Sequence, residues 1–89
     1  MNPTQRPDLT PDLVQDIVVR ATPNAGGFIN PTQQLLELGV LDDWQASLHS
    51  ARVQSSLNAI GWHVRRADID SAPTASVSAC TDSVLDNAF

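Results

Sequence analysis

The sequence has no lysine, no tyrosine, a single cysteine and no long run of apolar residues. Because a bridge needs two cysteines, Cys80 cannot form an intrachain disulfide, which is typical of a reducing compartment. No stretch approaches the roughly 20 apolar residues of a membrane span, and residues 1–7 lack the apolar core of a signal peptide. We therefore expect a cytoplasmic protein.

Positive charge is also scarce. The chain has five basic residues against ten acidic ones, for a formal net charge of -5. Since an acidic surface is repelled by phosphate groups, this charge disfavours nucleic acids and anionic membranes as partners. The basic residues are scattered along the chain and form no basic stripe: Arg6, Arg20, Arg52, Arg65 and Arg66.

The sequence also lacks recognisable catalytic sets. A chain of 89 residues makes one domain with a thin core and little room for a deep cleft. It contains no Ser–His–Asp set, P-loop or dinucleotide-binding glycine motif. His49 and His63 lack the acidic or thiol companions of a metal site. We expect a protein that is bound by other proteins rather than an enzyme, with no metal.

What the sequence does contain is a series of helical patterns after a polar leader at residues 1–9. Thr10 and Pro11 are typical of a helix start, with a threonine N-cap and proline at the first helical position. The segment 23–27 ends this helix. Its apolar residues share one face: Leu13, Val14, Ile17, Val18 and Ala21.

The connection over residues 28–41 is long and apolar. Because such a loop cannot remain in water, we expect it to lie across the helices and complete their core, with a short helical turn ending at Gly39. Its expected anchors are Phe28, Ile29, Leu35, Leu36, Leu38, Val40 and Leu41.

The second helix is expected to run from Asp42-Asp43 to about Ile60, with Gly61 as its stop. Its predicted buried face carries Trp44, Leu48 and Ala51, with Val53, Leu57, Ile60 and Val64 on a neighbouring stripe. Trp44 fits a core position and a partner contact equally well. Its predicted exposed face has no acid and consists of Ser47, His49, Ser50, Arg52, Gln54, Ser55, Ser56 and Asn58.

Residues 62–72 are expected to form a loop or a short third helix. Pro73 and Thr74 are expected to open a last helix, which directs Val77, Cys80 and Val84 inward. On this face Cys80 is a small core residue rather than a reactive thiol. The predicted fold of residues 10–89 is all-α, a small four-helix bundle with a long first loop.

Four segments, in order, resemble the phosphopantetheine-binding acyl and peptidyl carrier proteins. These are the loop segment 29–32 (INPT), the turn 37–44 (ELGVLDDW) at the start of the second helix, the helix ending 60–64 (IGWHV), and the segment 72–75 (APTA) before the last helix. The resemblance covers roughly residues 10–88. It implies a four-helix carrier fold of a polyketide, nonribosomal peptide or fatty-acid type pathway.

This sequence departs from the family at the modified residue, because Asp43 stands where the family has a serine. The family's serine hydroxyl attacks coenzyme A and holds the phosphopantetheine arm as a stable phosphodiester. A carboxylate would form an acyl phosphate, which water opens, and its charge would repel the incoming phosphate. The resemblance therefore implies a carrier-like protein without its arm, which acts by protein contacts.

Two alternatives stay open. In the first, the chain is a working carrier modified at Ser47, which forms a Ser-Leu pair with Leu48 one helical turn after Asp43. In the second, it is an unrelated helical interaction domain. The expected partners are enzymes of a biosynthetic assembly line, and 4'-phosphopantetheine is expected only if Ser47 is the true site. The residues expected to contact partners are Asp42, Trp44, Leu48, Arg52, Trp62 and Arg65.

Overall fold

The computed structural model describes residues 6–89. Three α-helices, α1 (Pro11–Arg20), α2 (Asp43–Ala59) and α3 (Val77–Asn87), alternate with three short 3-10 turns, η1 (Ala25–Gly27), η2 (Leu35–Leu38) and η3 (Arg66–Asp68). The described residues contain no strand, so the all-α prediction is confirmed. A four-helix bundle is not confirmed, since residues 6–89 form only three α-helices and a 3-10 turn of three residues occupies the place of the expected short third helix.

Helix α1 begins and packs as its sequence predicts. The Thr10 hydroxyl accepts a hydrogen bond from the Leu13 amide at 3.2 Å, which satisfies one of the free amides of the first turn. The predicted apolar face is buried, with Leu13 at its edge. Val19 is buried as well, because α1 lies against both α2 and α3.

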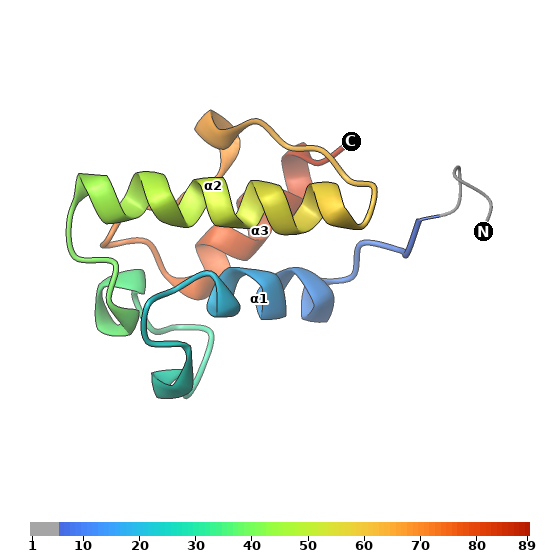
Figure 1. Cartoon of the computed structure of the whole chain (residues 1–89). Helices are drawn as coiled ribbons and strands as arrows, with labels where there is room; N and C mark the ends of the chain where they lie inside the picture. The colour runs from blue at the N-terminus through green and yellow to red at the C-terminus, as the bar shows by residue number, and fades with distance from the viewer. Residues whose placement is uncertain (1–5) are drawn as a thin grey trace.

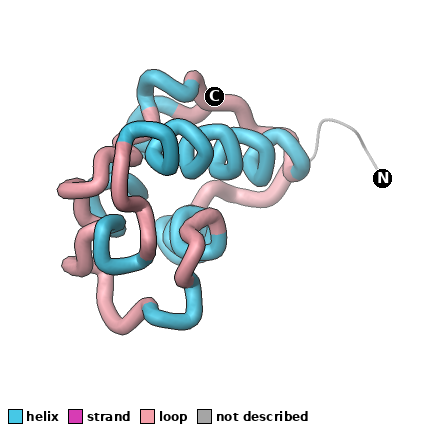
Figure 2. Tube along the Cα trace, turned by 60° about the vertical axis from the view of Figure 1, so that its left-hand side comes forward, coloured by secondary structure: helices cyan, strands magenta, loops and turns pink. Residues whose placement is uncertain are grey.

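The first loop completes the core, as predicted. Leu35, Leu38 and Val40 are fully buried. The loop is tied to the segment before α3 by backbone bonds, among them Leu35 N–H to Ala75 O at 2.8 Å. Figures 1 and 2 show η1 and η2 gathered at the end of the fold where α2 begins.

Gly39 ends η2 in the left-handed region with φ +98°, as its place in the sequence predicts. Three of the predicted anchors are wrong, since Ile29 is 81% exposed, Leu41 is 61% exposed and Leu36 is 41% exposed. Ile29 and Leu41 flank the packed part of the loop, and Leu36 points away from its buried neighbour Leu35.

Helix α2 buries Val53 and Leu57 as predicted, but the first half of the helix turns a different side to the core from the one expected. Trp44, which the sequence left open between the core and a partner contact, is 69% exposed, and Leu48 is only half-buried. His49 and Ser50, expected outside, are buried together with Val53 and Leu57. Burial of polar side chains costs little only if they are hydrogen-bonded, and these two are.

The imidazole of His49 joins three parts of the fold. Its Nε2 lies 2.9 Å from the Val18 carbonyl oxygen of α1, and its Nδ1 lies 2.6 Å from Ser71 Oγ. Because a carbonyl can only accept, Nε2 donates to Val18, and Nδ1 accepts from the Ser71 hydroxyl. Burial lowers the pKa of His49, so its neutral form is the one that holds α1, α2 and residue 71 together.

Helix α3 begins later than expected, at Val77 rather than near Pro73. Ser76 caps it by accepting from the Ala79 amide at 2.9 Å. Residues 73–75 are instead held by the first loop, whose Leu36 amide donates to the Pro73 carbonyl. The expected inward residues Val77, Cys80 and Val84 are fully buried, and burial raises the pKa of the Cys80 thiol to about 12.

The expected leader covers residues 1–9, of which residues 1–5 lie outside the described part of the chain. Residues 6–9 pack against the segment after α2. The Arg6 guanidinium lies 3.4 Å above the Trp62 ring, and Trp62 Nε1 donates to the Pro7 carbonyl at 2.8 Å. Trp62 therefore lies beyond the C-terminal end of α2, between residues 6–9 and the last residues of the chain. There His63 and Phe89 exchange two backbone hydrogen bonds.

Candidate functional site at the head of helix α2

The first turn of α2 is built by its own side chains. Asp42 is the N-cap, and its carboxylate accepts from the Gln45 amide at 2.8 Å. The Gln45 side chain in turn accepts from the Leu41 amide at 2.8 Å. Asp43 is the first helical residue and is exposed, directly after the long first loop. The structure therefore places residue 43 at the head of the longest helix, where the sequence predicted it.

Replacement of Asp42 by alanine is expected to lower the free energy of unfolding by about 1 kcal/mol, because the Gln45 amide loses its partner. The matched variant Asp43→Ala is expected to cost less, about 0.3–1 kcal/mol at low salt, since only the interaction with the helix dipole is lost. Urea denaturation of both variants measures the difference. An equal or larger loss for Asp43→Ala would mean that its carboxylate has a structural role.

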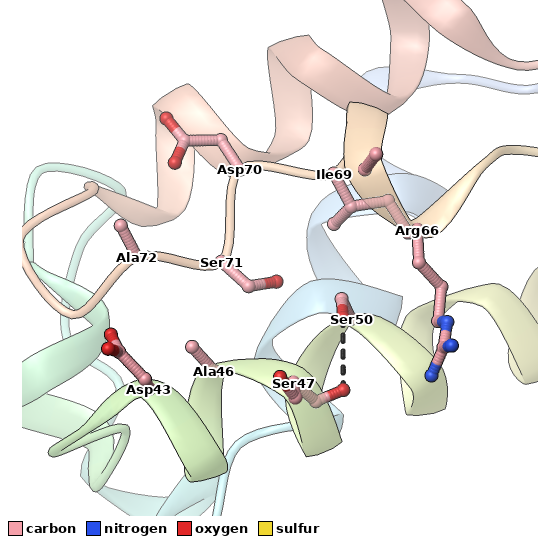
Figure 3. A pocket seen from close by; sticks show the side chains of 10 residues that line it. Asp43, Ala46, Ser47, Ser50, Arg66, Ile69, Asp70, Ser71 and Ala72 are labelled. Atoms are coloured by element: carbon pink, nitrogen blue, oxygen red, sulfur yellow. Dashed lines mark hydrogen bonds between the residues drawn. The ribbon is translucent and has the colours of Figure 1, made fainter.

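A shallow polar hollow of about 380 Å³ opens beside Asp43. Figure 3 shows Asp43 at one end of it, Arg66 at the other, and the Ser71 side chain directed between them from the facing segment. The helix α2 wall is made by Asp43, Ala46, Ser47 and Ser50, and the facing wall by Arg66, Ala67, Ile69, Asp70, Ser71 and Ala72.

Two of the serine hydroxyl groups around the hollow, those of Ser50 and Ser71, are engaged in hydrogen bonds. The Ser50 hydroxyl donates to the Ser47 carbonyl at 2.9 Å, the dashed line in Figure 3. Ser71 donates to His49, as a nucleophile does to its base, but Ser71 is only 5% exposed. A backbone carbonyl, rather than a carboxylate, orients the second nitrogen of His49. We assign this pair to the core rather than to catalysis.

Most of the residues predicted to form the site lie along the first half of α2 but on two sides of it, since Asp43 and Ser47 line the hollow while Trp44, Leu48 and Arg52 do not. Asp42, Asp43, Trp44, Ser47, Leu48 and Arg52 all lie in the first ten residues of α2 or at its cap. Trp62 does not belong to this group, because it lies beyond the far end of α2, which is roughly 25 Å long. Arg65 is exposed and precedes η3, and its neighbour Arg66 lines the hollow instead.

Sequence reasoning missed the facing wall of the hollow. Ala46, Ser47 and Ser50 follow Asp43 at helical spacing, so the α2 wall could have been found by counting along the helix. Residues 66–72 carry no such signal. Their position depends on the buried bond between His49 and Ser71 and on the bond from the Asp70 amide to Ser83 Oγ at 2.9 Å.

In residues 6–89, no three histidine, cysteine or acidic side chains lie close enough to hold a metal ion together. Nor does any described helix have both the length and the apolar character needed to cross a membrane.

Comparisons with protein-family models, with curated proteins and with solved structures found no match to this chain.

Proposed function

We propose that this chain is a carrier-protein-like domain that has no phosphopantetheine arm and acts through protein contacts, with enzymes of a biosynthetic assembly line in the cytoplasm as its partners. It performs no catalysis of its own in this proposal. The observation that carries the proposal is the position of Asp43, exposed at the first residue of the longest helix and directly after a long packed loop.

The surroundings of residue 43 support a contact surface rather than a loading site. The side chain there is a carboxylate, which does not fit the phosphodiester chemistry of the arm. Within the described residues no hydrogen bond holds this carboxylate, so it is open to a partner. The adjoining Trp44 is 69% exposed and Leu41 is 61% exposed. Large exposed apolar side chains beside a polar rim are typical of protein interaction sites.

A second candidate is a working carrier modified at Ser47. It is favoured by one observation, that Ser47 is exposed and lines the same hollow as Asp43. Against it, Ser47 lies one turn inside α2, away from the first loop. A helical backbone around the nucleophile gives a transferase less access than a helix start does.

Incubation of the purified chain with coenzyme A and a promiscuous phosphopantetheinyl transferase is expected to leave its intact mass unchanged. Asp43→Ser is expected to gain the mass of one arm, because a hydroxyl then stands at the helix start without the repelling carboxylate. The double variant Asp43→Ser/Ser47→Ala should gain the same mass. An active carrier protein in the same reaction is the positive control.

Two outcomes contradict the proposal in different ways. A mass gain by the unaltered chain that disappears in Ser47→Ala supports the working carrier instead. No gain of mass by Asp43→Ser, with the control protein fully loaded, contradicts the carrier-like proposal and favours an unrelated helical interaction domain.

A further inference from the structure

A groove separates the end of α1 from helix α2, on the other side of the buried stripe from the Asp43 hollow. It has a volume of about 460 Å³. Residues Trp44, Leu48 and Arg52 form its α2 wall at spacings of four, so they make one continuous ridge about 12 Å long. Its opposite wall is the turn Ala21, Thr22 and Pro23.

The groove has a mixed lining, in which the apolar surface of Trp44 and Leu48 lies beside the polar side chains of Gln45 and Arg52. The Thr22 hydroxyl is occupied, since it donates to the Val19 carbonyl, and Trp44 leaves 69% of its surface to solvent. Exposed tryptophan beside a groove is the residue type most enriched among side chains that dominate binding energy. The i, i+4 and i+8 side chains of Trp44, Leu48 and Arg52 form a ridge along α2, against which the apolar face of a second helix can lie.

The charge beside the groove indicates which kind of partner helix would bind there. From Trp44 to Ala67 the chain has no acidic residue, and of the three arginines in this segment Arg52 lines the groove. In residues 6–89 the single salt bridge is the pair Arg20–Asp16 on α1, so Arg52 at the end of the groove has no acidic partner there. A carboxylate in the groove would supply it.

We propose that the groove formed by Trp44, Leu48, Arg52 and residues 21–23 docks an amphipathic helical segment of a partner protein whose apolar side chains are flanked by acidic residues. The inference rests on the proposed contact role of this chain. A second copy is a poorer occupant, because its own groove would not face this one, and such head-to-tail pairing builds rings or open chains rather than a closed two-fold dimer.

The probe is a stapled amphipathic helix of about 15 residues, with leucines at every third and fourth position and glutamates on both flanks; a matched peptide carries lysines in place of the glutamates. Titration calorimetry gives the affinities, and the NMR spectrum of the labelled chain gives the site. We expect the acidic peptide to bind at least about tenfold more tightly than the basic one, with shifts at the Trp44 indole and in residues 21–23.

The variants separate apolar from charged contacts. Trp44→Ala is expected to weaken binding of the acidic peptide at least about tenfold. Arg52→Glu is expected to reverse the preference, so that the basic peptide binds more tightly than the acidic one. Arg65→Glu makes the same change of charge outside the groove and should keep the preference. All three side chains are exposed, so the fold is expected to survive each change.

Three results would overturn the inference. They are no binding of the acidic peptide at about 1 mM, equal binding of both peptides, and shifts confined to residues 66–72. Movement of the Trp44 signal with protein concentration alone would assign the groove to a second copy, which also contradicts it. None of these results depends on loading by a transferase, so this inference and the absence of an arm fail separately.

Discussion

Leu38→Ala is expected to lower the free energy of unfolding by about 2–5 kcal/mol, although residue 38 lies in the first loop. Its side chain is fully buried with Leu35 and Val40 in the same core as the helices. Truncation removes apolar contact and leaves a cavity that the short turn η2 can close only in part. For a domain of this size the loss is a large share of a total of about 5–15 kcal/mol. Urea denaturation measures it.

Leu41→Ala is the matched control, with the same chemical change in the same loop at a position that is 61% exposed. It is expected to change the free energy of unfolding by no more than about 0.5 kcal/mol. Similar small losses in both variants would show that the first loop does not belong to the core. The packed loop would then no longer hold residue 43 at the head of α2.

His49→Leu is expected to cost about 2–4 kcal/mol of unfolding free energy near pH 8. The substitution removes both hydrogen bonds of the imidazole and leaves the Val18 carbonyl and the Ser71 hydroxyl buried without a partner. The exposed residue His63 provides the control, since His63→Gln is expected to stay within about 0.5 kcal/mol of the unaltered chain.

The cost of His49→Leu is also expected to depend on pH. Burial lowers the pKa of His49 in the folded chain below the value of about 6.5 in the unfolded chain. Between these two values the unfolded chain binds a proton that the folded chain does not, so acid destabilises the fold. The difference between the unaltered chain and His49→Leu should therefore shrink below pH 6.5, by up to about 1.4 kcal/mol per pH unit.

Parallel stability curves for the two proteins from pH 8 to pH 5 would contradict this expectation. They would mean that the pKa of His49 is the same in the folded and unfolded chains, and that its imidazole is not buried in the core.

Much of the fold could be predicted because its signals are local. Thr10, Asp42 and Gly39 act through bonds within a few residues or through their own backbone angles, so composition and spacing reveal them. The start of α3 was predicted too early, because Pro73 suggests a helix start while its carbonyl is used by the first loop. That bond joins residues far apart in the sequence, and no local pattern reports it.

The sequence by itself determined the all-α class, the long first loop, the beginning of α2 and the carboxylate at residue 43. Each depends on the intrinsic preferences of neighbouring residues. The tertiary structure alone decided which face of α2 is buried. His49 has hydrogen-bond partners on two other parts of the fold and so can enter the core, which turns Trp44 out into solvent and opens a groove beside it. Polarity along a helix cannot predict such an exchange, because the cost of burial depends on partners that only folding brings together.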